Sequence, residues 1–306
     1  MRIALIARGD FAAAVIEAFA SRGETVAGIL GLAGDGEELD RTAKGKNIPV
    51  HRVADFAGPE AMQALRAMEA DLAVIGFMGA TVSPDLLAIP RHGAIQVHAS
   101  LLPRYRGPSP VSWPIARGEV ETGVTVFRPG ERPYEGPVIL QRTCAIKPEE
   151  TQGDLCRGEL LQLGVESLVT AAQLVVRGEQ IEVDQDENAA TYEGRFGDAE
   201  AEIHWASHAE IVHNLIRAAN PDPGAWTRIG GEVVRILDVC LVATHGEEDV
   251  KGSPGEIAAI DDDGFSVCAP GGCIAVRQVR PEGGRTVSAA AYARDRKLAR
   301  GQRLGV

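Results

Sequence analysis

A histidine followed by a proline-stiffened basic loop is the feature of this chain best suited to chemistry. His98 ends a short apolar run, Pro103 follows five residues later, and the basic segment RYRG occupies 104–107. An imidazole can transfer protons near neutral pH, and guanidinium groups bind anions. A lone histidine near a strand end is more often structural than catalytic, so its surroundings decide its role.

The residues before His98 predict a strand that would place the ring at a ligand-binding edge. Strand-like runs at 2–7 and 25–30 flank a segment, 11–21, whose apolar residues recur at helical spacing. This order predicts a Rossmann-like α/β domain with a parallel sheet, in which ligands bind at the carboxyl ends of the strands. The turn after the first run, ARGDF, contains no GxGxxG pattern, so a dinucleotide fingerprint is absent.

The second half of the chain has a different pattern. A long amphipathic helix at 151–177 would close the first domain, and from residue 224 the chain consists of short β-like runs separated by glycine and aspartate turns. These runs, at 233–243, 255–260, 265–269 and 274–279, predict a small OB-like β-barrel. We therefore expect a Rossmann-like domain at 1–180, a linker at 181–200 and a barrel domain at 201–306.

Composition indicates an acidic globular protein. The 306 residues are 45% hydrophobic and carry a formal net charge of -12, which argues against a broad nucleic-acid surface. Five cysteines without a CxxC pair fit reduced thiols in the cytoplasm, and we expect no metal site. Cys268 and Cys273 are close enough for a disulfide or a metal pair, but burial as small apolar residues is favoured. No signal peptide and no run of membrane-spanning length is visible, so we expect no membrane partner.

Three motifs, in order and spacing, resemble one family. They are VHASLLPRYRG from Val97, TGVTVF from Thr122 and EGPVIL from Glu135. Together they resemble the folate-dependent formyltransferases, which include methionyl-tRNA formyltransferases, sugar-amine formyltransferases and the hydrolase-type domain of formyltetrahydrofolate dehydrogenase. The segment IHWASHAEIVHNLIRAANPDPGAW at 203–226 resembles the start of the C-terminal barrel domain of the methionyl-tRNA enzymes, so the similarity spans nearly the whole chain.

The resemblance implies a reaction and three catalytic positions. An amine would attack the formyl group of 10-formyltetrahydrofolate, and in the family a histidine, an asparagine and an aspartate handle the oxyanion and the protons. The histidine corresponds to His98, but Gln96 and Tyr134 stand at the other two positions. Gln96 keeps a carboxamide one methylene further out. A phenol with a pKa of about 10 is a poor base, so the adjacent Glu135 is the candidate substitute, although neighbours on an extended segment point to opposite faces.

The same resemblance predicts a pterin pocket and an acceptor side. The pocket would be lined by two loops, with Phe77, Met78, Gly79, Ala80 and Val82 in one and Arg128, Gly130, Tyr134 and Gly136 in the other. The acceptor would meet Ser100, Leu101, Arg104 and Arg106; the alternative for the two arginines is salt bridges to the many carboxylates. The region 32–46 is acidic where the tRNA enzymes carry a basic insertion, and the basic stretch 294–303 fits a solvated helix end. A small amine acceptor is therefore favoured over tRNA.

Three activities remain open from the sequence. They are formyl transfer with an altered triad, hydrolysis or another one-carbon reaction on bound folate, and folate binding without turnover. A zinc site at His204, His208 and His213 is not expected, because His208 and His213 are five residues apart and do not share a helix face. The sequence does not indicate an oligomeric state.

Overall fold

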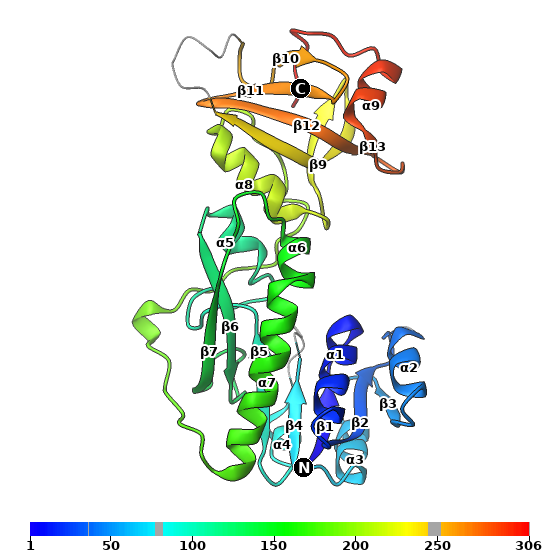
Figure 1. Ribbon diagram of the computed structural model, residues 1–306, viewed down its shortest axis with the longest axis vertical. Coiled ribbons are helices and arrows are strands. Elements are labelled where there is room, and N and C mark those ends of the chain that lie inside the picture. Colours follow the sequence, from blue (N-terminus) through cyan, green and yellow to red (C-terminus); the bar gives the residue numbers. More distant parts are fainter. Residues whose placement is uncertain (36, 77–81, 244–251, 306) are drawn as a thin grey trace. The chain divides into compact units, whose positions relative to one another are not determined.

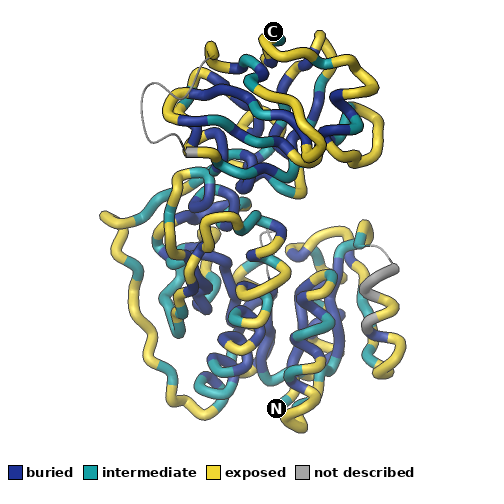
Figure 2. Tube along the Cα trace, turned by 45° about the horizontal axis from the view of Figure 1, so that its top comes forward, coloured by how far each residue is buried: buried dark blue, intermediate teal, exposed yellow. Residues whose placement is uncertain are grey.

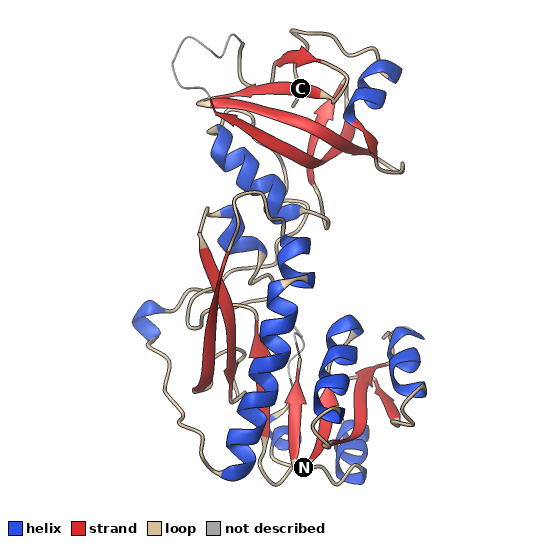
Figure 3. Ribbon diagram, viewed as in Figure 1, coloured by secondary structure: helices blue, strands red, loops and turns tan. Residues whose placement is uncertain are grey.

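Two compact units make up the chain. The computed structural model describes residues 1–35, 37–76, 82–243 and 252–305. The first unit consists of Met1–Pro110, Glu121–Ala145 and Arg157–Gly194, and the second of Val111–Val120, Ile146–Cys156 and Arg195–Val306. Each unit contains its own sheet (Figures 1 and 3).

The sheet of the first unit has seven strands in the order β3-β2-β1-β4-β5-β6-β7. The parallel strands are β1 (Arg2–Ile6), β2 (Thr25–Leu32), β3 (Val50–Val53), β4 (Leu72–Ile75) and β5 (Ala94–His98). Two antiparallel strands, β6 (Glu121–Phe127) and β7 (Val138–Ala145), extend it beyond β5. The predicted Rossmann-like sheet is confirmed, and β5 lies inside the sheet with both faces buried.

Helices cover both faces of this sheet. On one face α1 (Gly9–Ala20) and α7 (Glu159–Arg177) pack side by side (Figure 1). On the other, α3 (Pro59–Ala67) and α4 (Pro84–Leu87) share a buried cluster with Ala4, Ile6, Ala73, Ile75 and Ala94, which are alternate residues of β1, β4 and β5. The remaining elements are α2 (Glu37–Lys44) and the short 3-10 helix Glu187–Ala189. In Figure 2 the central strands, such as β4 and β5, are dark blue, whereas helices such as α1 mix buried and more exposed residues.

The helix predicted at 151–177 is two helices. Gly158, with φ -91° and ψ -112°, separates α6 (Gln152–Arg157) from α7, and Gly178 in the left-handed region ends α7. Contrary to the sequence-based expectation, 152–177 is apolar and long enough to cross a membrane by length and composition alone. Half of its most apolar window is buried in the protein, and α7 packs on β4 to β7, which is the environment of a core helix.

An antiparallel sheet forms most of the second unit. Its order is β10-β11-β12-β9-β8, with β13 paired to β12. The strands are β8 (Ala225–Ile229), β9 (Glu232–Ala243), β10 (Ile257–Ile260), β11 (Phe265–Ala269), β12 (Gly272–Pro281) and β13 (Val287–Ser288), and the helices are α5 (Ser112–Ala116), α8 (Ala209–Ala219) and α9 (Ala289–Asp295). The sequence pattern located β9 to β12 but missed β8 and β13, which are short and mix polar with apolar residues.

Residues 301–305 join the two edges of this sheet. Ile257 of β10 donates its N–H to the Gln302 carbonyl at 2.8 Å, and Gly305 donates to the Arg228 carbonyl of β8 at 2.8 Å. Leu304, only 4% exposed, forms a bridge to Ile229. This segment links strands at opposite edges of the sheet and gives the small barrel that the turn-rich pattern predicts.

Candidate functional site

Two polar side chains lie on one face of β5 near its carboxyl end. Gln96 and His98 are two residues apart and therefore share a face, and they are only 9% and 5% exposed. Phe127 and Thr125 of β6 lie directly opposite them in the antiparallel register. The central position of β5 explains how an apolar strand holds two polar residues away from solvent.

The imidazole of His98 is neutral and has a defined tautomer. Its Nε2 lies 3.0 Å from the carbonyl oxygen of Tyr105. A carbonyl oxygen only accepts, so Nε2 carries the proton and Nδ1 carries the lone pair. Burial lowers the pKa of His98 from 6.5 to about 4, opposed by the bond to Tyr105. Among the residues that the structure describes, none hydrogen-bonds Nδ1, which leaves that atom able to accept a proton.

Tyr134 stacks beside this imidazole. The two ring centroids are 4.7 Å apart with the planes tilted by 49°, and Tyr134 packs against Leu102 and Phe127. Burial, with a smaller contribution from Tyr192, raises the pKa of the Tyr134 phenol. The phenol is therefore protonated at neutral pH and can donate a hydrogen bond, but it cannot serve as a base.

The loop between β6 and β7 must turn back sharply to bring Tyr134 to His98. Tyr134 adopts φ 68° in the left-handed region. A Cβ added to Gly136 would lie 1.5 Å from the Arg128 carbonyl oxygen, so only glycine fits there. The Gln185 carboxamide donates to the carbonyls of Tyr134 and Gly136 at 2.8 and 2.7 Å, which holds the returning loop.

Thr125 organises the loop that follows His98. Its hydroxyl donates to the Ser100 carbonyl at 2.6 Å and accepts from the Leu102 N–H at 3.0 Å and from the Gln141 amide at 2.8 Å. The Ser100 hydroxyl donates to the Arg104 carbonyl at 2.8 Å. Sequence reasoning missed Thr125 and Gln141. The TGVTVF motif was the available signal, because it contains the residue opposite His98.

Arg106 is buried in an internal network. Its guanidinium donates to both carboxylate oxygens of Glu187 at 2.9 and 2.7 Å and to the side-chain Oε1 of Gln185 at 2.9 Å. Hydrogen bonding to Glu187 raises the pKa of Arg106 further. We call residues 183–194 the strap. Its backbone also pairs with the basic loop, through a β-bridge between Tyr192 and Arg106. The sequence left two roles open for Arg106, a contact with the acceptor and a salt bridge. The structure shows the salt bridge.

Glu135 belongs to the same network. One carboxylate oxygen lies 3.8 Å from Arg106 Nη1, and the other lies 2.6 Å from Arg132 Nε. These contacts hold Glu135 as the anionic partner of two arginines. The proton-accepting group in ring contact with Tyr134 is the imidazole of His98.

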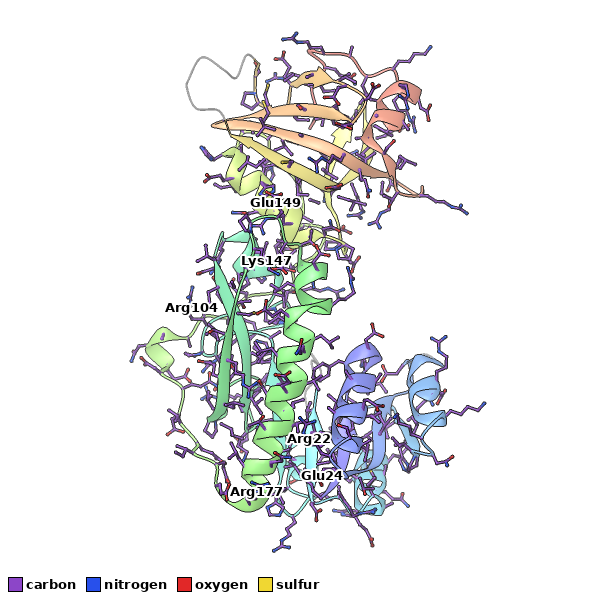
Figure 4. The ribbon with its side chains drawn as sticks, viewed as in Figure 1. Arg22, Glu24, Arg104, Lys147, Glu149 and Arg177 are labelled. Atoms are coloured by element: carbon purple, nitrogen blue, oxygen red, sulfur yellow. The ribbon has the colours of Figure 1, made fainter. Side chains whose placement is uncertain are left out.

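The other predicted residues are more widely distributed. Arg104, labelled in Figure 4, is exposed and its guanidinium lies 5.2 Å from the Tyr105 ring centroid. Arg128 donates to the carbonyls of His92 and Ala94 at 2.7 and 3.2 Å, at the opposite end of β5 from His98. Val82 is in the apolar core, Leu101 is half-buried near Gly123, and an added Cβ at Gly130 would meet no atom within 4 Å. Phe77, Met78, Gly79 and Ala80 lie outside the described residues.

The structure thus brings together Gln96, His98 and Tyr134, all uncharged at neutral pH. Ser100 shapes the loop beside them, whereas Glu135 and Arg106 interact with each other and Arg128 lies at the far end of the strand. Within the described part of the chain, no three His, Cys, Asp or Glu residues come close enough to hold a metal ion. The arrangement offers two neutral hydrogen-bond donors and one proton acceptor.

Comparison with known proteins identifies matches in both units. Residues 1–171 match the family model described as Formyl transferase, and residues 196–297 match Formyl transferase, C-terminal domain. The chain is 32% identical over 314 residues to the methionyl-tRNA formyltransferase of Moorella thermoacetica, covering 100% of this chain and 99% of that protein.

Two further matches are a dehydrogenase and a solved N-formyltransferase. The human mitochondrial 10-formyltetrahydrofolate dehydrogenase is 31% identical over 307 residues, which cover 95% of this chain and 33% of that protein. The solved N-formyltransferase from Helicobacter canadensis, in complex with folinic acid and dTDP-3-aminofucose, superposes with a TM-score of 0.69 at 17% identity. That superposition covers 90% of this chain and 98% of the solved one, and it establishes a shared fold.

Proposed function

Because this chain belongs to the formyl transferase family, we propose that it transfers the formyl group of 10-formyltetrahydrofolate to the amine of a small acceptor. The observation that carries the proposal is the contact between the neutral imidazole of His98 and the neutral phenol of Tyr134, on the sheet face that also holds Gln96. These groups match the needs of acyl transfer to an amine, in which an oxyanion forms and a proton must leave the nucleophile.

Each of the three side chains would have one task. The amide N–H of Gln96 and the phenol O–H of Tyr134 would donate hydrogen bonds to the developing oxyanion. The Nδ1 lone pair of His98 would accept the proton of the attacking amine and return it to the departing nitrogen, because the Tyr105 carbonyl holds Nε2 protonated. The bound 10-formyltetrahydrofolate supplies the acyl carbon. Removing one oxyanion donor typically costs about 2.7–4 kcal/mol of barrier.

The dehydrogenase relative supports the choice of folate donor, and the net charge supports the small acceptor. That relative is named for 10-formyltetrahydrofolate, and the Helicobacter canadensis enzyme was solved with folinic acid and an amino sugar. A chain with net charge -12 would repel the long phosphate backbone of a tRNA acceptor over much of its surface. In the basic C-terminal stretch, Arg296 already pairs with Glu232 at 2.8 Å.

Formylation of a charged initiator tRNA is the second candidate. One observation favours it: the Moorella thermoacetica relative, named a methionyl-tRNA formyltransferase, aligns over the full chain and includes the second unit. Electrostatic contacts with tRNA would make that activity fall steeply as salt is raised, whereas a small uncharged amine would show little salt dependence.

An acceptor panel tests the proposal. Protein and 10-formyltetrahydrofolate would be incubated with no acceptor, with nucleotide-linked amino sugars, with free amino acids and with methionyl-tRNA, while tetrahydrofolate release and formylated product are followed. We expect product from a small amine. Release without acceptor would instead identify a hydrolase, product from methionyl-tRNA alone would identify the second candidate, and folate binding without release would contradict catalysis.

Replacement of His98 tests the mechanism. His98→Ala should lower turnover by about 100-fold or more, because general base catalysis is lost, while circular dichroism and the cooperativity of thermal unfolding stay as in the wild type. Val120→Ala, at a 77% exposed position that has no proposed role in binding or catalysis, is the matched control for handling and should retain turnover. Full activity of His98→Ala would exclude the proposed role of the imidazole.

A further inference from the structure

A tight hairpin in the second unit places two cysteines opposite each other. Strands β11 and β12 pair with Ala269 opposite Gly272 and Cys268 opposite Cys273, across the turn Pro270–Gly271. Opposite residues of an antiparallel pair point to the same face of the sheet. The two thiols therefore project side by side, and both are reduced in this structure.

The backbone hydrogen bonds show which kind of pair this is. The N–H of Cys268 donates to the Glu256 carbonyl at 2.9 Å, and its carbonyl accepts from the Gly255 N–H at 2.9 Å. Both backbone groups are thus directed away from Cys273. Opposed residues that do not exchange backbone bonds have their Cα atoms about 4.5 Å apart, which lies near the short end of the roughly 4.4–6.8 Å that disulfides span.

The two thiols also interact directly and differ in access. Burial, followed by the charge and hydrogen bond of Cys273, raises the pKa of the Cys268 thiol to about 11. Cys268 is 1% exposed, whereas Cys273 is partly exposed. A reagent from solution would therefore meet Cys273 first, with Cys268 in place behind it.

We propose that Cys268 and Cys273 form a reversible dithiol–disulfide site whose oxidant is a low-molecular-weight disulfide. Cys273 Sγ, as the thiolate, attacks one sulfur of the small disulfide; the S–S bond breaks, one small thiolate leaves, and a mixed disulfide forms. Cys268 gives up its proton and attacks Cys273 Sγ, and the second small thiolate leaves. The cysteine pair loses two electrons and two protons, and the small disulfide gains them as two thiols.

The turn of this hairpin is packed against the start of α8. The Pro270 carbonyl accepts the N–H of Ala209 in the first turn of α8 at 2.8 Å. A Cβ on Gly271 would lie 2.1 Å from His208 Nε2, so the turn is packed tightly against that end of the helix. Because Cys273 is partly exposed, thiols in solution can reach the disulfide, and exposed disulfides are readily reduced again. The site therefore suits reversible rather than permanent cross-linking.

Mass spectrometry of the full chain tests the proposal. The protein would be treated with oxidised glutathione, alkylated and digested, then treated with dithiothreitol. In the wild type we expect a peptide cross-linked between Cys268 and Cys273, with the loss of two hydrogen atoms, and its complete reversal by reductant. Cys268→Ala should instead accumulate a glutathione adduct on Cys273, and Cys273→Ala should give no adduct at Cys268.

A matched control separates this pair from the other thiols. Cys240→Ala, on the adjacent strand β9, should leave the yield of the cross-link unchanged. A persistent glutathione adduct on wild-type Cys273, or no reaction at either cysteine while Cys240 is modified, would overturn the proposal. These outcomes do not depend on folate or on formyl transfer, so failure of the proposed function would leave them unaffected.

Discussion

At the scale of single residues, the site is defined by the absence of charge on its three polar side chains. Burial keeps the imidazole of His98 neutral and the phenol of Tyr134 protonated. The family motifs pointed to the same three positions, which the structure places on or beside one face of β5. It could not determine that the Glu135 carboxylate would pair with Arg132 and Arg106, because that pairing depends on how the loop between β6 and β7 folds back.

The burial of His98 makes stability depend on pH. Since its pKa of about 4 lies below the 6.5 of an exposed histidine, the unfolded chain takes up a proton first, and stability falls as the pH drops from about 6.5 to about 4. From about pH 7 to about pH 5 this ring should cost about 2 kcal/mol. Urea unfolding of the wild type and His98→Phe at the two pH values would measure this loss. The comparison isolates His98, because His213, whose pKa burial also lowers, is present in both proteins. Equal losses in the two proteins would disprove the assignment.

Tyr134 allows the proposed donor role to be separated from packing. Tyr134→Phe keeps the ring against His98 but removes the hydroxyl, so turnover should fall by about 100-fold while the acceptor KM changes little. Tyr134→Asp would restore the carboxylate of the family pattern beside His98 and should shift the acidic limb of the turnover profile to higher pH, because a nearby anion raises the pKa of a histidine. Unchanged turnover in Tyr134→Phe would rule out the donor role.

At the scale of elements, the strap and the basic loop hold each other. The backbone N–H of Arg106 donates to the Thr191 carbonyl at 3.0 Å, and Glu193 donates back to the Arg106 carbonyl at 2.9 Å. The sequence predicted the strand that ends at His98, which is β5, because a buried strand has a strong apolar pattern. It predicted only a linker at 181–200, since those backbone bonds reach across more than eighty positions and leave no local periodicity.

Gly107 is the point at which this pairing is most sensitive. It has φ 121°, and an added Cβ would lie 2.0 Å from the Glu193 carbonyl oxygen. Gly107→Ala should therefore destabilise the protein by about 1–3 kcal/mol, from backbone strain and separation of the strap. Gly130→Ala, where an added Cβ meets no atom within 4 Å, is the matched control and should change stability little. Equal urea midpoints for the two variants would contradict the pairing.

At the scale of the whole molecule, the sequence predicted a Rossmann-like sheet and a separate small antiparallel one, and both are present. The change from helical spacing to short β-runs near residue 224 was sufficient to predict a separate second sheet. The sequence pattern predicted a barrel but not the segment that closes it, because residues 301–305 contain no strand pattern and pair with two strands that are distant in sequence.

Leu304 provides a test of this closure. Its side chain is 4% exposed between the two edge strands, so Leu304→Ala should cost about 2–5 kcal/mol of unfolding free energy. Ile211→Ala, at a 56% exposed position of α8, is the control and should stay within about 0.5 kcal/mol of the wild type. Thermal unfolding would compare the two. A Leu304→Ala protein as stable as the control would show that the segment is dispensable.

The bridge made by residues 301–305 has a consequence for biosynthesis. A ribosome adds these residues after every strand that they connect, and its exit tunnel covers them for some time afterwards. Until they emerge, Ile257 and Arg228 keep backbone groups that lack their later partners. The nascent second unit therefore has two open strand edges for that interval, and a translational pause there would prolong the period in which it could pair with a neighbouring chain.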